Sequence, residues 1–401
     1  MVLKSEIEKA YWDQQNKIKK EHQHVLRYKQ RSISLNDNHI QVISGIRRCG
    51  KSTLMHHLLK NYQHIAYFNF EDPRIINFDI HDFSKLDEII PSKVEAYFFD
   101  EIQNIAQWEV YIRQLHDNGN KVFITGSNAS LLSKELGTRL TGRYLKTELF
   151  PFSYSEFLTF EKMDASSKSL ELYLKKGGFP EFLKSKNIEI LHNLLKDIVL
   201  RDVAIRHQIK SVKSLMDITL YLLSNIGKET SATRLKNNFQ IGSTHTVIDF
   251  LGWLEDAYLF FFLPKFSYSA KSISINPKKV YAIDNGFIDA NSLSFSEDKG
   301  RILENAVYIH LRNQGNTLYY FKEKNECDFI LFDQGKCKMV LQVCHEVHVD
   351  NQEREFNGLI EAMNFFNLDT GTIITHSQKD NFRIKDKSIM LIPAYEFFID
   401  L

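Results

Sequence analysis

Apolar runs alternate with longer amphipathic stretches over the N-terminal part of the chain. Between positions 39 and 150 the runs are HIQVIS, HIAYFNF, EAYFFD, KVFITGS and YLKTELF, each short enough for one strand. Strands that alternate with helical segments are typical of βαβ units. The pattern therefore predicts an α/β fold with a parallel sheet over this region.

The pattern changes along the rest of the chain. Residues 1–38 are polar and periodic, which predicts an N-terminal helix, and residues 170–263 contain long amphipathic stretches such as LHNLLKDIVLRD. An α/β pattern resumes after SYSAKSISINPKK and continues to the C-terminus. Because 401 residues exceed one ordinary core, we predict three domains: an α/β domain over 1–160 that includes the helix, a helical segment over 161–290, and a small α/β domain over 291–401.

Composition narrows the class of protein and its partners. Hydrophobic residues make up 43% and charged residues 25%, as in folded soluble proteins. The net charge is +1, so an anionic partner must be met by a local patch. We expect no membrane span and no signal peptide, because no long apolar stretch free of charge is present. The four cysteines lack zinc-like spacing, which favours reduced thiols and a cytoplasmic location: Cys49, Cys327, Cys337 and Cys344.

The segment GIRRCGKS lies where the first apolar run gives way to a helical pattern. Glycines let the backbone curl so that successive N–H groups face phosphate oxygens, and the following helix adds its positive end. Lys51 would contact the β- and γ-phosphates of ATP, and Ser52 would bind Mg²⁺. The alternative is a glycine turn that only caps a helix. The predicted nucleotide-binding residues are Gly45, Ile46, Arg47, Arg48, Cys49, Gly50, Lys51, Ser52 and Thr53.

An acidic pair follows the apolar run EAYFFD, which ends in Asp100 and is followed directly by Glu101. Asp100 would hold Mg²⁺ through water, and Glu101 would polarise the attacking water as general base. The alternative is a strand that ends in surface acids. Together with the phosphate loop, the pair favours ATP hydrolysis over nucleotide holding.

Polar residues also end the next apolar run, KVFITGSNASLL, at Thr125, Ser127 and Asn128. In a parallel sheet this strand end would lie beside the γ-phosphate, where Ser127 or Asn128 would orient the attacking water. A polar turn with a helix N-cap is the competing interpretation.

Two arginines, Arg139 and Arg143, precede the last run of this region. An arginine that reaches a neighbouring subunit's γ-phosphate stabilises charge in the transition state. This role, expected of Arg143 before Arg139, predicts a homo-oligomer. The alternative is a pair of ordinary surface arginines.

Five segments taken in order resemble the prokaryotic AAA-type ATPases of the archaeal-ATPase-like group: GIRRCGKSTLM, FFDEIQNIAQWE, ITGSNASLLS, RLTGRYLKTELFPFSYSEFL and GGFPEFL. The resemblance covers nearly all of the chain. It implies a P-loop ATPase domain with an additional strand between the P-loop strand and the acidic strand. It also implies a winged-helix module and a restriction-endonuclease-like C-terminal domain whose function is unassigned.

The segment 212–263 has a helix–helix–helix order followed by strands, which fits a winged helix-turn-helix. Residues 201–280 carry 11 Lys and Arg against 6 Asp and Glu, so the basic excess of the chain is concentrated here, as binding to duplex DNA requires. The alternatives are a helical lid on the ATPase and a protein-binding module. Ser243 or Thr244 would begin the third helix, with a core face of Val247, Phe250, Leu251 and Leu254.

The C-terminal segment has the order Glu304, Asp328, Gln342-x-Cys344, which resembles the restriction-endonuclease-like core. That core has Glu-x-Lys where this chain has Gln342 and Cys344. An amide replaces a Mg²⁺ carboxylate poorly, and a thiol does not replace an ammonium. Glu326 would compensate in part, being on the same strand face as Asp328. We therefore expect a degenerate nuclease fold used for binding or assembly, or an α/β domain without chemistry.

The leading functional hypothesis is a Mg²⁺-dependent ATP-binding protein and ATPase whose nucleotide state controls a DNA- or partner-binding module. An ATP-dependent DNA nuclease is one alternative, which Gln342 and Cys344 disfavour. A switch that binds ATP tightly and hydrolyses it slowly is another, and Glu101 disfavours that one.

Overall fold

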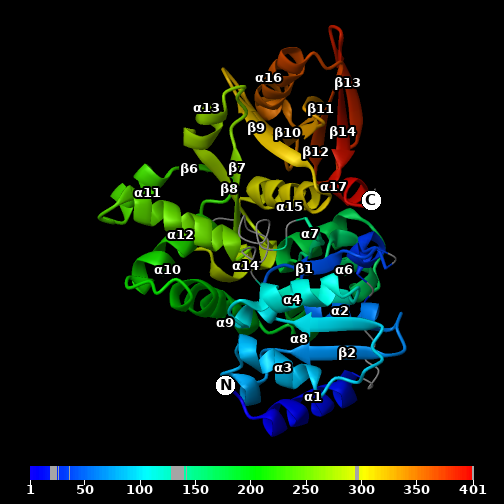
Figure 1. The fold of residues 1–401 in the computed structure, drawn as a ribbon. Coiled ribbons are helices and arrows are strands. Elements are labelled where there is room, and N and C mark those ends of the chain that lie inside the picture. The colour runs from blue at the N-terminus through cyan, green and yellow to red at the C-terminus, as the bar shows by residue number, and fades with distance from the viewer. Residues whose placement is uncertain are drawn as a thin grey trace. The chain divides into compact units, whose positions relative to one another are not determined.

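The computed structural model describes residues 1–18, 25, 27–35, 37–127, 140, 142–293 and 298–399 (Figure 1). The chain divides into two compact units, Met1–Phe150 and Pro151–Leu401. The division into three domains that the sequence pattern suggests stays a prediction. Within the described residues, no helix combines the length and the apolar character needed to span a membrane.

The N-terminal unit is built on a five-stranded sheet in the order β2-β3-β4-β1-β5. All neighbouring strands are parallel, so their carboxyl ends lie at one edge. Strand β4 lies between β1 and β3, as the family resemblance implies. The strands are β1 (Ile40–Ser44), β2 (Ile65–Asn69), β3 (Ala96–Asp100), β4 (Lys121–Gly126) and β5 (Tyr144–Glu148).

Helices cover this sheet because its strands are apolar on both faces. Alternation sends Phe99 towards Tyr111 of α4, and Phe98 to the other face, where it stacks on Phe123 at 4.6 Å. Helix α1 contacts β2, and α2 contacts β3 and β4. The helices are α1 (Lys4–Ile18), α2 (Lys51–Leu59), α3 (Phe83–Asp87) and α4 (Trp108–Asp117), with 3₁₀ turns at Tyr28–Ser32, Pro73–Ile75, Ile80–Asp82 and Ile102–Asn104.

The N-terminal helix is shorter than the helix expected over 1–38. Helix α1 covers Lys4–Ile18 of the described residues, and Tyr28–Ser32 forms only a 3₁₀ turn. Just before β1, the Asp37 carboxylate accepts a hydrogen bond from the backbone N–H of His39 at 2.9 Å. Aspartate side chains that bond the backbone two residues on favour turns over helix, so the polar end of this stretch is a turn.

The second unit begins with a helical segment. Its glycine pair, Gly177 and Gly178, has a steric reason, since a Cβ on Gly178 would lie 2.2 Å from the carbonyl oxygen of Phe152. The serines Ser153 and Ser166 form capping boxes at the first two helices. The helices are α6 (Tyr154–Glu161), α7 (Ser167–Lys176), α8 (Pro180–Ser185), α9 (Glu189–Asp197), a π-helix at Ile198–Ile205, and α10 (Val212–Leu223).

Three helices and a small antiparallel sheet follow, with the sheet order β6-β8-β7. Helix α12, the third helix of the order expected over 212–263, has Ser243 as its N-cap, whose hydroxyl accepts a hydrogen bond from His245 N–H at 3.1 Å. Val247, Phe250 and Leu254 are buried as expected, and Leu251 is half-buried. The elements are β6 (Glu229–Thr230), α11 (Ala232–Asn238), α12 (Thr244–Asp256), β7 (Phe260–Pro264), α13 (Ala270–Ile275) and β8 (Lys278–Ala282).

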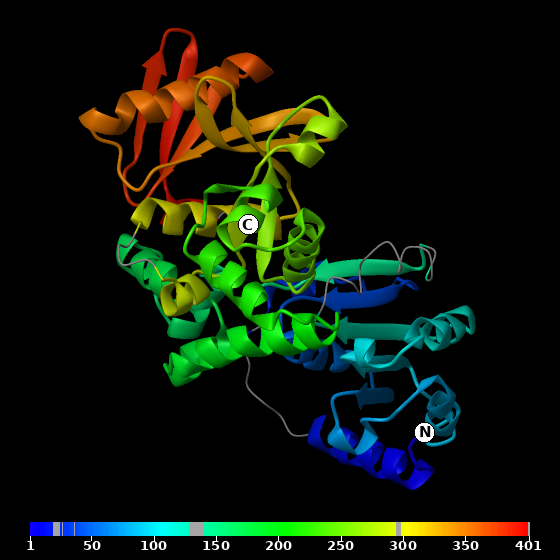
Figure 2. The same ribbon diagram turned by 90° about the vertical axis from the view of Figure 1, so that its left-hand side faces the viewer.

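The C-terminal part contains a six-stranded mixed sheet in the order β13-β14-β12-β11-β10-β9. Helix α16 lies along one face of it (Figure 2) and packs on β10, β11 and β12. Strands β11, β12 and β14 are parallel to one another. The elements are α14 (Asn285–Asn291), α15 (Lys299–Asn313), β9 (Thr317–Lys322), β10 (Glu326–Asp333), β11 (Lys336–Val343), α16 (Val349–Phe366), β12 (Thr370–Thr375), β13 (Asp380–Ile384), β14 (Lys387–Pro393) and α17 (Ala394–Phe397).

Candidate functional site

The glycine-rich loop connects the end of β1 to the start of α2. Gly45 has no room for a side chain, since a Cβ there would lie 2.1 Å from the carbonyl oxygen of Leu149. Gly50 caps α2 in a left-handed conformation with φ 104°. Arg48 also has a positive φ of 63°. The loop is therefore tightly curled at the carboxyl edge of the sheet, as a phosphate-binding loop requires.

Lys51 points back into this loop with only 3% of its side chain exposed. Its ammonium donates to the carbonyl oxygens of Gly45 at 3.1 Å and Ile46 at 3.3 Å, and forms an ion pair with Glu101 at 3.4 Å. Burial acts to lower the pKa of Lys51, but the Glu101 carboxylate opposes this and the net pKa is raised. A charged ammonium is thus held inside the loop.

Asp100 ends β3 and is fully buried among polar partners. Its carboxylate accepts hydrogen bonds from the hydroxyls of Thr125, Ser52 and, at 3.1 Å, Tyr67. Burial and the neighbouring Glu101 raise the pKa of Asp100. Ser52 and Asp100 therefore lie side by side at the mouth of the loop.

Glu101 adopts a left-handed conformation with φ 54°, and its N–H donates to Thr125 Oγ1 at 3.0 Å. Gln103 Nε2 donates to the Glu101 carboxylate at 2.5 Å and to Ser127 Oγ at 3.3 Å. Burial favours a higher pKa, but Lys51 and Gln103 outweigh it, so the pKa of Glu101 is lowered. The carboxylate is therefore ionised at neutral pH. Gln103 Oε1 has no hydrogen-bond partner within the described residues, so this oxygen remains available as an acceptor beside Glu101.

The remaining predicted site residues are accounted for as follows. Within the loop the side chains of Ile46 and Cys49 are buried, and Arg47 forms an ion pair with Glu71 at 3.2 Å. Thr53 lies in the first turn of α2. Asn128 and Arg139 fall outside the described residues.

Arg143 lies at the amino ends of the parallel strands, whereas the loop lies at their carboxyl ends. It immediately precedes β5, and its carbonyl oxygen accepts the N–H of Ile40 at 2.9 Å, where β1 begins. Its guanidinium forms an ion pair with Asp117 at 3.2 Å. A five-residue strand spans about 16 Å, so Arg143 does not share an edge with the loop of its own subunit.

Several residues at this site were not expected from the sequence. Arg27 braces the loop, donating to the carbonyl oxygens of Cys49 and Phe150 at 2.6 Å each. Nothing local marks it, because it belongs to a stretch read as an N-terminal helix. Asn69 donates a hydrogen bond to Asp100 at 3.5 Å. It is a polar residue at the end of an apolar strand, which is the same sequence signal that pointed to Thr125.

The donor set at the loop fits a magnesium nucleotide. Mg²⁺ prefers oxygen ligands and is usually held by one or two protein groups together with phosphates. The Ser52 hydroxyl and the Asp100 carboxylate are adjacent oxygen donors of this kind. A phosphate chain in the curled loop would complete the set.

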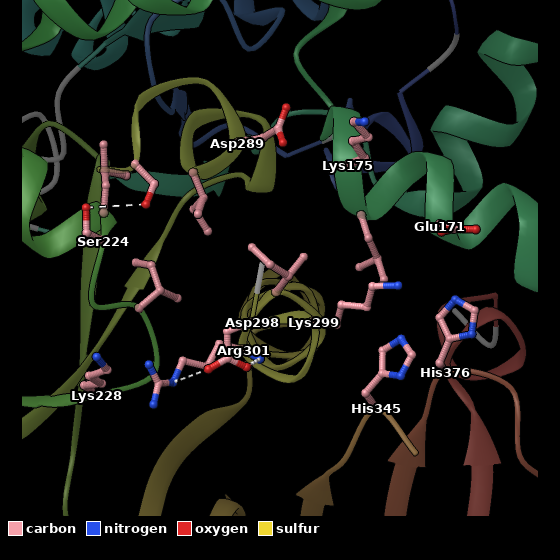
Figure 3. Close-up of a pocket in the computed structure, with 16 residues that line it drawn as sticks. Glu171, Lys175, Ser224, Lys228, Asp289, Asp298, Lys299, Arg301, His345 and His376 are labelled. Atoms are coloured by element: carbon pink, nitrogen blue, oxygen red, sulfur yellow. Dashed lines mark hydrogen bonds and ion pairs between the residues drawn. The ribbon is translucent and has the colours of Figure 1, made fainter. Parts of the chain in front are cut away.

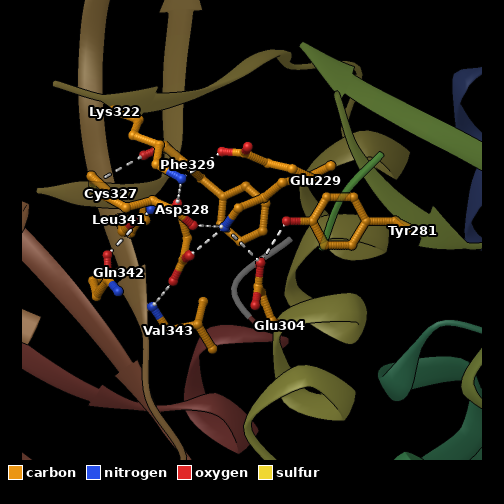
Figure 4. A network of polar contacts seen from close by, with 12 residues as sticks. Glu229, Tyr281, Glu304, Lys322, Cys327, Asp328, Phe329, Leu341, Gln342 and Val343 are labelled. Atoms are coloured by element: carbon orange, nitrogen blue, oxygen red, sulfur yellow. Dashed lines mark hydrogen bonds and ion pairs between the residues drawn. The ribbon is translucent and has the colours of Figure 1, made fainter. Parts of the chain in front are cut away.

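A second buried lysine lies in the other unit. Figure 4 shows Glu304, Asp328 and Tyr281 of the polar network to which it belongs. Lys279 of β8 has 3% of its side chain exposed and forms ion pairs with three carboxylates: Asp328 at 2.7 Å, Glu326 at 2.8 Å and Glu304 at 3.2 Å. Tyr281 donates its hydroxyl to Glu304 at 2.6 Å. Glu304 and Asp328 are the acidic residues that the nuclease resemblance marks, and Glu326 is the residue expected to compensate in part. Lys279 itself was missed, because Lys278-Lys279 reads as an exposed charge pair.

The two positions that depart from the nuclease pattern have structural partners. Gln342 accepts the N–H of Asp328 at 3.2 Å and donates to Glu355 at 2.7 Å. Cys344 follows the end of β11 and is buried in the core with Phe356. A cleft of about 630 Å³ opens beside the acidic cluster and is lined by Glu304, Asp328, Gln342 and Glu355 among others.

This second cluster does not fit a metal ion. Within the described residues, no group of three His, Cys, Asp or Glu side chains is arranged to hold one. The Lys279 ammonium lies where the three carboxylates meet. Burial, followed by the neighbouring Asp328, raises the pKa of Glu304 to about 7.

The sheet order, the curled loop and the acidic strand define a P-loop domain of the AAA type. The profile of a family described as "AAA domain" matches residues 37–158, and a family of unknown function matches residues 167–298. The chain belongs to the family of AAA-domain proteins that includes the uncharacterized protein MJ1544 of Methanocaldococcus jannaschii. That protein is 37% identical over 400 residues, which cover 91% of this chain and 89% of the relative.

Other similarities are more distant. An uncharacterized protein of Haemophilus influenzae is 31% identical over 82% of this chain and 88% of its own length. Among solved structures, a chain of Drosophila ORC bound to AT-rich DNA and Cdc6 has a TM-score of 0.21 and covers 71% of this chain and 90% of that one. Cdc6p from Pyrobaculum aerophilum has a TM-score of 0.27 over 67% and 94%. Both are 11% identical to this chain.

Proposed function

We propose that the N-terminal unit is a Mg²⁺-dependent ATPase. The observation that carries this proposal is the convergence of three side chains at the carboxyl edge of the sheet: the Lys51 ammonium in the loop, Asp100 bonded to Ser52, and the ionised Glu101. Lys51 binds the β- and γ-phosphates, and Ser52 with Asp100 holds the metal, which neutralises phosphate charge. Glu101 takes a proton from the attacking water.

The Lys51–Glu101 ion pair sets the order of events in the proposed ATPase cycle. Before ATP binds, the ammonium is shared between Glu101 and two backbone carbonyls. A γ-phosphate carries more charge than these partners, so Lys51 turns to it and leaves the Glu101 carboxylate free to act on water. Gln103, which bonds both Glu101 and Ser127, keeps that carboxylate in position. Turnover is thereby coupled to the arrival of the γ-phosphate.

The test is phosphate release from ATP with Mg²⁺ and with EDTA. We expect Lys51→Ala to weaken nucleotide binding, and Glu101→Gln to keep binding but lower turnover at least a hundredfold. Glu88→Gln is the matched control, since this exposed carboxylate pairs with Lys4. A Glu101→Gln variant that hydrolyses ATP at the wild-type rate would contradict the general-base assignment.

We propose further that Arg143, or failing it Arg139, acts on the nucleotide of a neighbouring subunit. The support is that Arg143 is 38% exposed and lies at the edge opposite its own loop. Arg143→Ala and Glu101→Gln subunits should each be inactive alone, whereas their mixture should regain activity at interfaces that combine one intact group from each. A monomer in sedimentation with full ATPase activity would rule this out.

We propose that the nucleotide state controls a winged-helix-like module formed by α10–α12 and β6–β8. Helix α12, in the position of a recognition helix, carries no Lys or Arg. Exposed apolar side chains occur instead on this module: Ile248 at 54%, Ile275 at 70% and Tyr268 at 83%. These features favour a partner protein.

Duplex DNA is the second candidate partner, because the basic excess of the chain lies in 201–280. Electrostatic DNA binding weakens steeply as salt rises. ATPase rates with and without duplex DNA at two salt concentrations separate the two: salt-sensitive stimulation by DNA would favour the duplex, and no stimulation a protein partner.

For the C-terminal restriction-endonuclease-like domain we propose binding or assembly without cleavage. The support is that Gln342 and Cys344 stand where the metal carboxylate and the lysine are expected, while Lys279 forms ion pairs with the remaining acids. Purified protein should not nick plasmid DNA with Mg²⁺. Robust nicking that Asp328→Ala abolishes would revive the nuclease alternative.

A further inference from the structure

A cavity of about 460 Å³ lies in the second unit (Figure 3). It is next to the acidic cleft and shares Asp298 and Arg301 with it. It is lined by α7, the segment after α10, α14, the start of α15, and the residues that follow β11 and β12. Its volume is in the range of small-molecule sites. Its floor is apolar, formed by Leu174, Leu223, Ile226, Ile288 and Ile302.

Basic side chains gather on one side of this cavity. Figure 3 shows the Lys299 ammonium beside the imidazoles of His345 and His376, with Lys175 on the neighbouring helix. Glu171 is the carboxylate drawn on this side. Lys175 and Lys299 form no ion pair within the described part of the chain.

The fold brings His345 and His376 into contact with each other. They follow the parallel strands β11 and β12, and the N–H of His376 donates to the carbonyl oxygen of His345 at 3.0 Å. Their rings stack with centroids 4.8 Å apart. Ligands of α/β sheets commonly bind at the carboxyl ends of parallel strands, and the first turn of the 15-residue helix α15 adds a positive dipole end beside Lys299.

The electrostatics agree with this geometry. Burial lowers the pKa of His345, and the neighbouring His376 and Lys299 lower it further. On the far side, burial and then Arg301 lower the pKa of Lys228. The carboxylate of Asp298 is already used, since it forms an ion pair with Arg301 at 3.2 Å. The Lys299 ammonium therefore supplies the positive charge of this group, and the two histidines, whose pKa values are lowered, supply imidazole N–H donors. The Glu171 carboxylate on the same side acts against this lowering at both histidines.

We propose that this cavity binds a small organic phosphate. The phosphate monoester lies against Lys299, His345 and His376, and its apolar or heterocyclic body lies on the leucine and isoleucine floor. A dianion matches the several donors better than a carboxylate does, and the floor selects an organic ester over free phosphate. This site is independent of the ATPase proposal.

Calorimetric titration of the full chain tests the site with four probes: phenyl phosphate, ribose 5-phosphate, inorganic phosphate and benzoate. We expect phenyl phosphate to bind at least tenfold more tightly than each of the other three. Ribose 5-phosphate lacks the apolar body, inorganic phosphate lacks any body, and benzoate lacks the second charge. Equal affinity for benzoate and phenyl phosphate would overturn the phosphate assignment, and no heat with any phosphate at millimolar concentration would overturn the site.

Variants locate the binding. Lys299→Gln and His376→Gln should each weaken phenyl phosphate about tenfold, the loss expected for one charge-assisted hydrogen bond. Both side chains lie on the cavity rim, and the exposed Lys184→Gln in α8 is the charge-matched control. Lys51→Met must leave the affinity unchanged. If Lys51→Met abolishes the heat, or Lys299→Gln behaves like Lys184→Gln, the ligand binds elsewhere and the proposal is wrong.

Discussion

Lys51 and Lys279 are equally buried, with 3% of each side chain exposed, yet different groups surround their ammonium ions. Lys51 has one carboxylate at 3.4 Å and two neutral carbonyl oxygens. Lys279 has three carboxylates within 3.2 Å. An ammonium is attracted more strongly to a carboxylate, which carries a full charge, than to a carbonyl oxygen, which carries a partial one. Lys51 is therefore held loosely enough to transfer to a phosphate, whereas Lys279 is fixed by its own domain.

Because the two lysines differ in their number of carboxylate partners, removing each of them would leave a different negative charge behind. Removing Lys51 would leave one ionised carboxylate, Glu101, that Gln103 still bonds. Removing Lys279 would leave Glu304, Glu326 and Asp328 facing one another. Lys51, with one carboxylate partner, can therefore exchange it for the phosphate that we propose, whereas Lys279 has three carboxylate partners within the chain. The cation that these three carboxylates surround is thus a side chain of the protein itself.

The largest expected effect is on stability. Lys279→Met should destabilise the second unit by about 3–5 kcal/mol, because it leaves buried carboxylates without their cation. The Lys51→Met substitution should lower the free energy of unfolding by less than half of that amount. Urea unfolding, with hydrogen exchange of β10 and β11 peptides as a local readout, measures both. Lys278→Met, the half-buried neighbour on the same strand, is the control, and an equal loss in Lys278→Met would remove the distinction.

The next effect is on nucleotide affinity, where the order of the two lysines reverses. Lys51→Met should weaken ATP binding about tenfold to a hundredfold, the value of one charge-assisted bond to phosphate. Lys279→Met should leave it unchanged. Titration with a slowly hydrolysed ATP analogue gives both constants. Loss of ATP binding in Lys279→Met would contradict the separation of roles.

A smaller effect should follow from adding metal. In Lys279→Met the three carboxylates become available to a divalent cation, so Mn²⁺ at ten times its dissociation constant should restore about 1.4 kcal/mol of stability. The wild-type protein should show no such gain, because its ammonium occupies the position. Mn²⁺ stabilisation of wild type that Asp328→Asn removes would show that Lys279 yields to metal.

The smallest expected effect depends on pH. Burial first, then Asp328, raises the pKa of Glu304 to about 7, and Lys279 opposes this rise. Between pH 4.5 and 7 the folded chain keeps a proton that the unfolded chain has released, so stability falls as pH rises through this range. Without Lys279 the pKa rises further.

The deficit of Lys279→Met against wild type should therefore be smaller at pH 5 than at pH 8, by about 1.4 kcal/mol for each pKa unit. Unfolding midpoints at the two pH values test this. The added substitution Glu304→Gln should flatten the dependence, and a deficit that stays constant with pH would exclude Glu304 as the titrating group.

Part of the nucleotide site is predictable from sequence because its determinants are local. Gly45, Gly50, Lys51 and Ser52 lie within eight residues, and a strand-to-helix turn brings them together without help from the rest of the chain. Asp100 follows the same logic, since parallel strands end at a common edge. The short-range spacing and the apolar periodicity therefore determined the sheet, the loop and the acidic strand end.

Tertiary structure decided the rest. Arg27 reaches Cys49 and Phe150 from a distant segment, and Lys279 meets acids from α15 and β10, contacts that no local pattern encodes. An adjacent lysine pair looks exposed in sequence, because the sequence does not say which member faces three carboxylates. Ion pairs across long sequence separations depend on how the elements pack. For that reason the sequence predicted the lysine that we propose to bind phosphate, and only the fold revealed the buried lysine among three carboxylates.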